Sequence, residues 1–193
     1  MENIKINNYE NAGKRISLLK ICFIALFAAL IAGGTFIAIP IGPVPIVLQN
    51  LFIVLAGLIL GPIMGAASVG LYLLAGLLGA PIFAGFTSGI TRFAGPTGGY
   101  LIGYMLAALV AGLIAGKPGI NASLGRIIIA VAAGFLIVYV PGLLWLNHIT
   151  DMTLDRLFIS GFVIFLPGDI LKGIAAVLVA KRARRTAADF LDN

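Results

Sequence analysis

The chain has 193 residues, of which 61% are hydrophobic and 10% charged, and its mean hydropathy is +1.12. An average soluble domain carries about 25% charged residues, so this composition excludes a soluble protein and predicts an integral membrane protein. The net charge of +6 does not indicate nucleic-acid binding, because the basic residues cluster beside apolar segments, as they do at the cytoplasmic ends of membrane helices.

Six apolar segments follow one another, and each predicts a membrane helix: 18–39, 46–60, 62–79, 98–116, 124–146 and 157–180. A transmembrane helix needs about 20 mainly apolar residues. The second and third segments are short for this, so we expect the Gly61-Pro62 turn between them to be buried among neighbouring helices. The first segment is longer than a signal-peptide core and lacks a cleavage site after it, so we expect it to be retained.

The predicted fold is therefore an all-α integral membrane protein, a six-transmembrane-helix bundle. Residues 18–181 form the membrane domain, with tails at 1–17 and 182–193. An even number of helices puts both tails on one side, where ten basic residues face two on the other side, Arg92 and Arg156. This bias predicts that both termini are cytoplasmic and that the protein is a multi-pass protein of the plasma membrane. A five- or seven-helix count would break this agreement.

Glycines recur every four residues in two runs, at Gly57, Gly61 and Gly65 and at Gly95, Gly99 and Gly103. Small residues at this spacing let membrane helices approach closely, and we interpret them as packing positions inside the bundle.

Two opposite charges stand in the last apolar segment, Asp169 and Lys172, although 21–91 contains no charged residue or histidine. Three residues apart on a helix, they share a face. An ionised side chain at the centre of a membrane helix costs about 2.5–3.5 kcal/mol and usually lines a pathway or pocket. The pair is our main candidate for a ligand site. The alternative is a self-neutralising pair that only stabilises the bundle.

Three further residues are candidates for ligand contacts. Arg92 lies in the long third connection and can hold a carboxylate bidentately, or it is an ordinary solvated loop arginine. Gln49 follows Pro43-Val44-Pro45 and either contacts polar groups of a ligand or caps the second helix. Tyr139 offers a hydroxyl or a flat apolar wall deeper in the membrane.

Membrane-enzyme chemistry is poorly supported. Ser88 with His148 faintly resembles an intramembrane serine protease, but the spacing of the serine motif is wrong and the histidine lies in a loop. There is no Gly-x-x-x-x-Gly-Lys-Ser/Thr motif for ATP, so active transport would need a partner or an ion gradient. We expect no catalytic residue, no metal site and no cofactor.

Four stretches of the chain form a recognisable pattern: Pro43-Val44-Pro45-Ile46-Val47-Leu48-Gln49, Gly79-Ala80-Pro81-Ile82-Phe83-Ala84-Gly85, Gly95-Pro96-Thr97-Gly98-Gly99-Tyr100-Leu101-Ile102-Gly103 and Pro167-Gly168-Asp169-x-x-Lys172. Together they resemble the BioY family, the biotin-specific substrate-binding (S) components of energy-coupling factor (ECF) transporters. The resemblance runs from about Ala25 to Lys172. Family members often carry a hydroxyl residue where this chain has Val47, and Arg92 belongs to no family signature.

The resemblance implies a six-helix bundle that binds biotin with high affinity in an outward-facing pocket. It also implies partners: a transmembrane coupling protein and two cytosolic ATPases. Asp169 suits the N–H donors of the ureido ring of biotin, and a second cation suits its carboxylate. The alternatives are an S-component for another vitamin, a small membrane enzyme, or a structural or channel-like bundle.

The first helix carries two alanine pairs four residues apart, Ala25 with Ala29 and Ala28 with Ala32. Such pairs form a flat strip that another helix can approach closely. S-components are similar in carrying this motif for the shared coupling protein, so the strip is expected to be the docking face. The alternative is ordinary packing inside the bundle.

Overall fold

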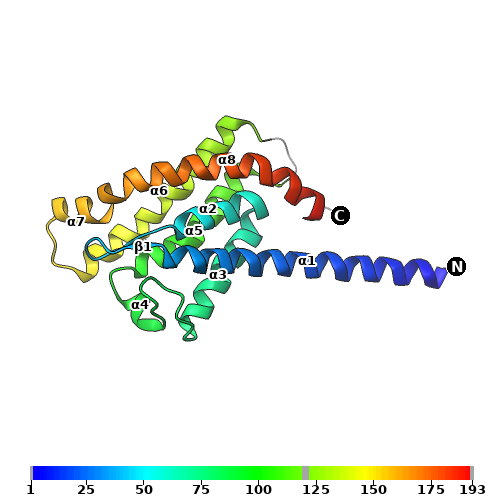
Figure 1. Cartoon of the computed structure of the whole chain (residues 1–193), viewed down its shortest axis with the longest axis horizontal. Coiled ribbons are helices and arrows are strands. Elements are labelled where there is room, and N and C mark those ends of the chain that lie inside the picture. The colour runs from blue at the N-terminus through cyan, green and yellow to red at the C-terminus, as the bar shows by residue number, and fades with distance from the viewer. Residues whose placement is uncertain (1, 119–121, 192–193) are drawn as a thin grey trace.

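The computed structural model describes residues 2–118 and 122–191, and these form a mostly helical bundle (Figure 1). In chain order the elements are α1 (Glu2–Phe36), β1 (Ala38–Ile39), β2 (Ile46–Val47), α2 (Gln49–Leu60), α3 (Pro62–Leu77), α4 (Ile90–Ala94), α5 (Gly98–Ala115), α6 (Leu124–Ile149), α7 (Leu154–Gly161), a 3-10 turn (Val163–Phe165) and α8 (Leu166–Leu191).

In the described part of the chain, four stretches are long and apolar enough to cross a membrane: Leu18–Phe36, Gly98–Ala115, Leu124–Ile149 and Leu154–Phe190. The helices α2 and α3 are apolar but shorter, with 12 and 16 residues. Most of α2 is buried against its neighbours, and Gly61 at the turn to α3 is buried too. A helix surrounded by other helices does not need to match the full thickness of the bilayer.

The last predicted segment, 157–180, is not one continuous helix. The short helix α7 ends at Gly161, and Phe162 leaves helical geometry with φ −138° and ψ −62° before the 3-10 turn begins. Pro167 then lies in the first turn of α8, where its missing N–H removes no helical hydrogen bond. The prediction of a single helix was therefore wrong here, and Asp169 belongs to the first turn of α8 rather than to a helix centre.

Backbone contacts at glycines hold the bundle together, as the spacing predicts. A Cβ atom on Gly57 would lie 2.2 Å from the carbonyl oxygen of Ala108, and one on Gly99 would lie 2.2 Å from that of Pro141. No side chain fits at such distances, so α2 packs directly on α5, and α5 directly on α6.

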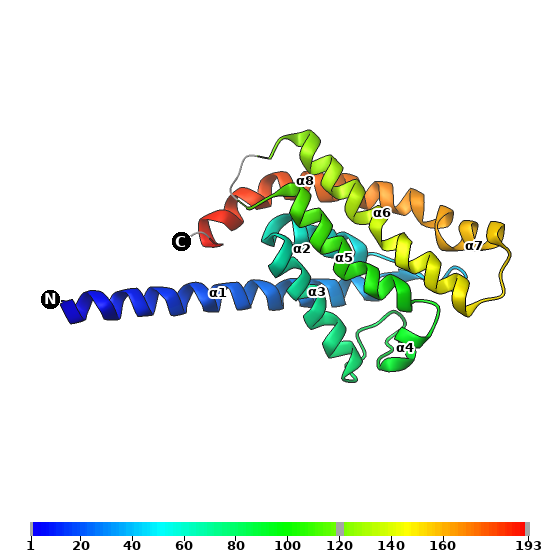
Figure 2. The same ribbon diagram turned by 180° about the vertical axis from the view of Figure 1, so that it is seen from behind.

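Both ends of the chain lie at the same end of the molecule, and the first part of α1 extends beyond the other helices (Figures 1 and 2). The described residues of the expected tails, 2–17 and 182–191, are helical and belong to α1 and α8. At the end of α8, Arg184, Ala187 and Ala188 are buried, so this part of the helix packs on the bundle.

Candidate functional site

A buried ion pair lies at the start of α8. Asp169 Oδ1 is 2.5 Å from Lys172 Nζ, and the two residues are 6% and 7% exposed. The spacing of three residues puts both side chains on one face of the helix, as expected. Each charge offsets much of the cost of burying the other.

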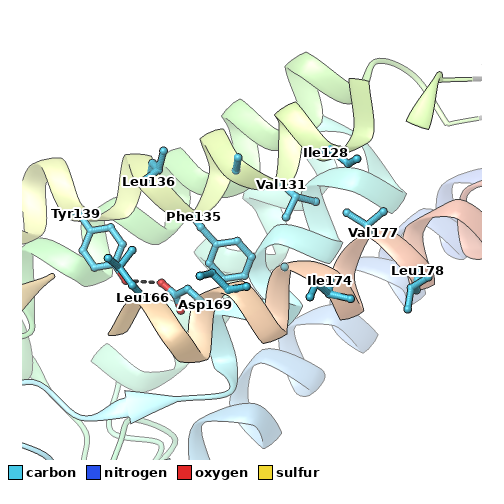
Figure 3. Close-up of a pocket in the computed structure, with 13 residues that line it drawn as sticks. Ile128, Val131, Phe135, Leu136, Tyr139, Leu166, Asp169, Ile174, Val177 and Leu178 are labelled. Carbon is cyan, nitrogen blue, oxygen red and sulfur yellow. Dashed lines mark hydrogen bonds between the residues drawn. The ribbon is translucent and has the colours of Figure 1, made fainter. Parts of the chain in front are cut away.

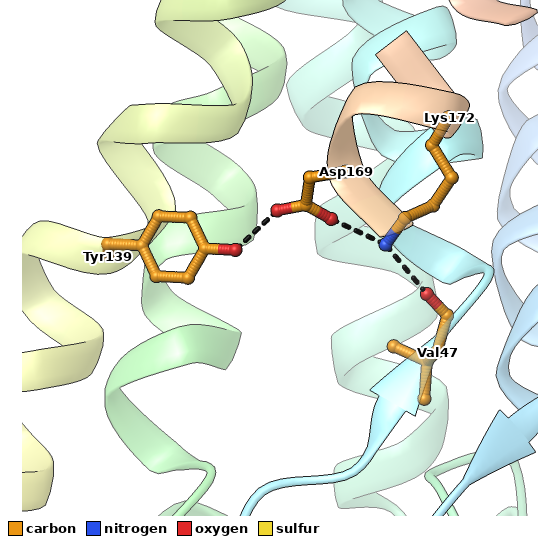
Figure 4. A network of polar contacts seen from close by, with 4 residues as sticks. All are labelled: Val47, Tyr139, Asp169 and Lys172. Carbon is orange, nitrogen blue, oxygen red and sulfur yellow. Dashed lines mark hydrogen bonds and ion pairs between the residues drawn. The ribbon is translucent and has the colours of Figure 1, made fainter. Parts of the chain in front are cut away.

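Two neighbours complete this network (Figure 4). The Tyr139 hydroxyl on α6 donates to Asp169 Oδ2, and Lys172 Nζ also donates to the Val47 carbonyl on β2 at 3.2 Å. The ring of Phe135 lies 5.9 Å from the ammonium group. Because Val47 takes part through its backbone, this contact needs no hydroxyl side chain at that position. The network joins α6, α8 and the β1–β2 hairpin.

A second set of polar side chains lies at a small cavity of about 30 Å³ next to the same hairpin. Its walls come from the hairpin, α2, α3, α5 and the segment between α3 and α5: Val44, Pro45, Val47, Gln49, Tyr72, Phe83, Ala84, Arg92, Thr97, Leu101 and Tyr104. Val47 belongs to both sites: it lines the cavity, and its carbonyl oxygen accepts a hydrogen bond from Lys172.

Gln49 is held with its amide group in a defined orientation. Its side chain is 2% exposed. The Thr35 hydroxyl lies 2.8 Å from Gln49 Oε1, and the Tyr72 hydroxyl donates to the same oxygen at 3.4 Å. In the described part of the chain, Gln49 Nε2 is buried without a hydrogen-bond partner. A buried donor left unpaired costs about 1–3 kcal/mol.

Arg92 lies on α4 and contacts the loop that covers the cavity. Its Nε donates to Thr87 Oγ1 at 2.5 Å and its Nη2 donates to the Ala84 carbonyl at 2.6 Å. Phe83 and Thr87 pair through their backbones in the same loop. The guanidinium is thus half-buried and fixed at the cavity wall, and it is not a freely solvated arginine.

The structure divides the five predicted ligand residues into two adjoining groups. Asp169, Lys172 and Tyr139 form the ion-pair network, whereas Gln49 and Arg92 line the small cavity. Sequence reasoning missed Thr35, Tyr72 and Tyr104. Thr35 and Tyr72 are hydroxyl residues inside apolar helices, where buried polar groups need a partner, and that signal was available.

The alanines of α1 separate into two faces. Ala25 and Ala29 are exposed, whereas Ala28 is buried in the core and Ala32 packs partly against it. The two pairs therefore do not form a single exposed strip.

Comparisons with known proteins place the chain in a family. The family model for the BioY family matches residues 8–189. A probable biotin transporter BioY of Pyrococcus horikoshii is 41% identical over 163 residues, covering 84% of this chain and 94% of the relative. The biotin transporter BioY of Lactococcus lactis is 38% identical, covering 82% and 86%.

A solved structure has the same fold. It is the crystal structure of the S-component for biotin from an ECF-type ABC transporter, with a TM-score of 0.80 and 35% sequence identity. The match covers 88% of this chain and 92% of that one.

Proposed function

The chain belongs to the BioY family, and we propose that it is the biotin-binding subunit of an ATP-driven vitamin uptake system. One observation carries this proposal: the buried Asp169–Lys172 pair contacts Val47, which also lines the cavity where the buried amide nitrogen of Gln49 has no partner among the described residues. Biotin combines two N–H donors, a ureido oxygen, an apolar ring and a carboxylate. An apolar site with few convergent polar groups matches such a ligand.

Asp169 is proposed to accept the ureido N–H groups. An ionised carboxylate offers about four acceptor sites, and Tyr139 and Lys172 occupy two of them. Lys172 neutralises the carboxylate and fixes its orientation. Gln49 Nε2 is proposed to donate to an oxygen of the ligand, and Arg92 to hold the biotin carboxylate.

Binding requires the loops to move. The cavity of about 30 Å³ is far below the roughly 300–1,000 Å³ usual for ligand pockets. The β1–β2 hairpin and the loop around Phe83 form its cover. Lys172 donates to the Val47 carbonyl in the hairpin, and Arg92 donates to Thr87 and to the Ala84 carbonyl in the loop. We propose that the ligand displaces the Val47 carbonyl from Lys172 and so reaches the ion pair.

The remaining parts of the proposal concern the membrane and the partners. We propose that the protein spans the plasma membrane six times with both termini in the cytoplasm, and that it passes biotin to a transmembrane coupling protein with two cytosolic ATPases. Ala25 and Ala29, which are exposed on α1, are the proposed docking residues.

Calorimetric titration of the purified protein with biotin tests the proposal, with thiamin as the control ligand. We expect saturable 1:1 binding of biotin and no binding of thiamin. Asp169→Asn should weaken binding at least tenfold, because a hydrogen bond to a charged group contributes about 1.5–3 kcal/mol. This substitution leaves Lys172 without its counter-ion, so the double variant Asp169→Asn/Lys172→Gln serves as a charge-neutral control for folding. Unchanged biotin affinity in both variants would refute the assignment of Asp169.

A further inference from the structure

A large apolar groove runs along the surface between α6 and α8 (Figure 3), and it shares no lining residue with the small cavity. Its volume is about 480 Å³, and its walls are apolar except at its inner end. On α6 it is lined by Ile128, Ala132 and Leu136, and on α8 by Ile170, Ile174 and Leu178, with further residues at its floor.

The groove lies on the outside of the bundle within two membrane-crossing stretches. Ile170 and Leu178 are 62% and 64% exposed, and Ile128 and Leu136 about half exposed. Both walls belong to Leu124–Ile149 and Leu154–Phe190. Hydrocarbon is therefore the medium that meets this groove, and a polar vitamin is not a suitable occupant.

Its length corresponds to one leaflet of the bilayer. The lining residues run from Ile128 to Tyr139 on α6, which is roughly 16 Å at 1.5 Å per residue. One half of a hydrocarbon core about 30 Å thick spans about 15 Å. The inner end of the groove meets Tyr139 and Asp169 (Figure 3).

The other end of the groove leads to exposed positive charges. The stripe Ile170, Ile174 and Leu178 repeats every four residues, and the next position on that face is Arg182. Gly173 and Val177 continue in the same way to Lys181. Both cations are exposed, at the end of the molecule where the chain termini lie. Basic side chains at this level attract anionic headgroups by about 1 kcal/mol each.

From this geometry we propose that the groove binds one acyl chain of an anionic phospholipid from the leaflet on the side of the two termini. The chain fills the space between α6 and α8, and the headgroup phosphate lies beside Arg182 and Lys181. The bound chain then separates the Tyr139–Asp169 contact from the mobile lipid around it. This is a second binding site, and it does not depend on the proposed vitamin ligand.

Native mass spectrometry of the delipidated protein, titrated with phosphatidylglycerol or with phosphatidylcholine of identical chains, tests the proposal. We expect one phosphatidylglycerol per protein, with an occupancy at least fivefold above that of phosphatidylcholine. Ala132→Phe fills the groove and should abolish this binding. Ile102→Phe is the matched control, because Ile102 is exposed on α5 outside the groove.

The headgroup assignment has its own pair of variants. Arg182→Ala should lower phosphatidylglycerol occupancy several-fold and leave phosphatidylcholine unchanged, whereas Arg156→Ala, which removes the same charge from α7, should change neither. Biotin binding that persists in all variants verifies their folding. Equal lipid retention by Ala132→Phe and Ile102→Phe would overturn the groove assignment, as would a protein dimer that only Ala132→Phe dissociates. Equal binding of the two lipids by the wild type would overturn the headgroup assignment.

Discussion

At the scale of single residues, the molecule combines buried charge with buried amide groups, and each is stabilised by a neighbour. Asp169 is neutralised by Lys172 and receives the Tyr139 hydroxyl. Gln49 is oriented by Thr35 and Tyr72. Removing one member of such a group lowers the free energy of unfolding by more than the contribution of the lost hydrogen bond, because the remaining member stays buried without a partner.

We predict that Gln49→Leu weakens biotin binding by a few-fold to tenfold, in line with about 0.5–1.5 kcal/mol for a neutral hydrogen bond. Thr35→Val should cause a smaller loss, since Thr35 acts only by orienting Gln49. Thr35→Ser keeps the hydroxyl and should restore wild-type affinity. Calorimetry on the four proteins gives the comparison, and a Thr35→Ser protein as weak as Thr35→Val would contradict the orienting role.

The role of Arg92 can be separated from its contacts with the loop. Arg92→Ala should weaken binding of biotin but hardly affect biotin amide, which lacks the carboxylate. Thr87→Val removes one of the loop contacts and keeps the charge, so it should affect both ligands equally. If Arg92→Ala lowers the affinities for the two ligands by the same factor, Arg92 supports the loop and does not hold the carboxylate.

At the scale of elements, the apolar runs predict where most helices lie, and Pro and Gly between the runs predict where several of them end. The boundaries of α2, α3 and α5 lie close to those predicted, because Pro and Gly stand at both sides of each. The break at Phe162 has a weaker signal, since Gly161 stands alone before it within an apolar run and Pro167 follows five residues later. The polar network was predictable for Asp169 and Lys172, whereas the Val47 contact uses a backbone carbonyl, which no side-chain pattern reveals.

The end of α8 provides the clearest prediction for an element. Arg184 is 4% exposed and donates to carbonyl groups at the ends of two helices, to Leu58 on α2 and to Ala115, Gly116 and Lys117 at the end of α5. The last carbonyls of a helix have no partner within it. One guanidinium therefore caps both helices and fixes α8 against them.

Arg184→Gln should consequently lower the midpoint of thermal unfolding in detergent, with a loss of about 1–3 kcal/mol for the buried carbonyls left unpaired. Arg185→Gln removes the same charge from an exposed neighbour and should leave the midpoint unchanged. A thermal shift assay on the two variants decides this, and equal midpoints would show that the carbonyls find other partners.

At the scale of the whole molecule, the two faces of α1 have different neighbours. Ala28 is 7% exposed in the core, where it packs with Ile31, whereas Ala25 and Ala29 lie on the outer face. The spacing of the alanines in the sequence reveals the two pairs but not which alanines face away from the bundle, since all four are small and apolar. Only the packing of α1 on α2 and α3 distinguishes them.

This difference provides an internal control for the proposed docking surface. Ala25→Trp/Ala29→Trp places bulk on the outer face, so the isolated subunit should bind biotin normally while assembly with the coupling protein, measured by co-purification, is lost. Ala28→Trp inserts the same bulk into the core, where overpacking costs about 1–3 kcal/mol or more, and should lower the unfolding midpoint. Normal co-purification of the double variant would show that another face of the molecule meets the partner, because two indole rings on this strip would prevent a close helix contact.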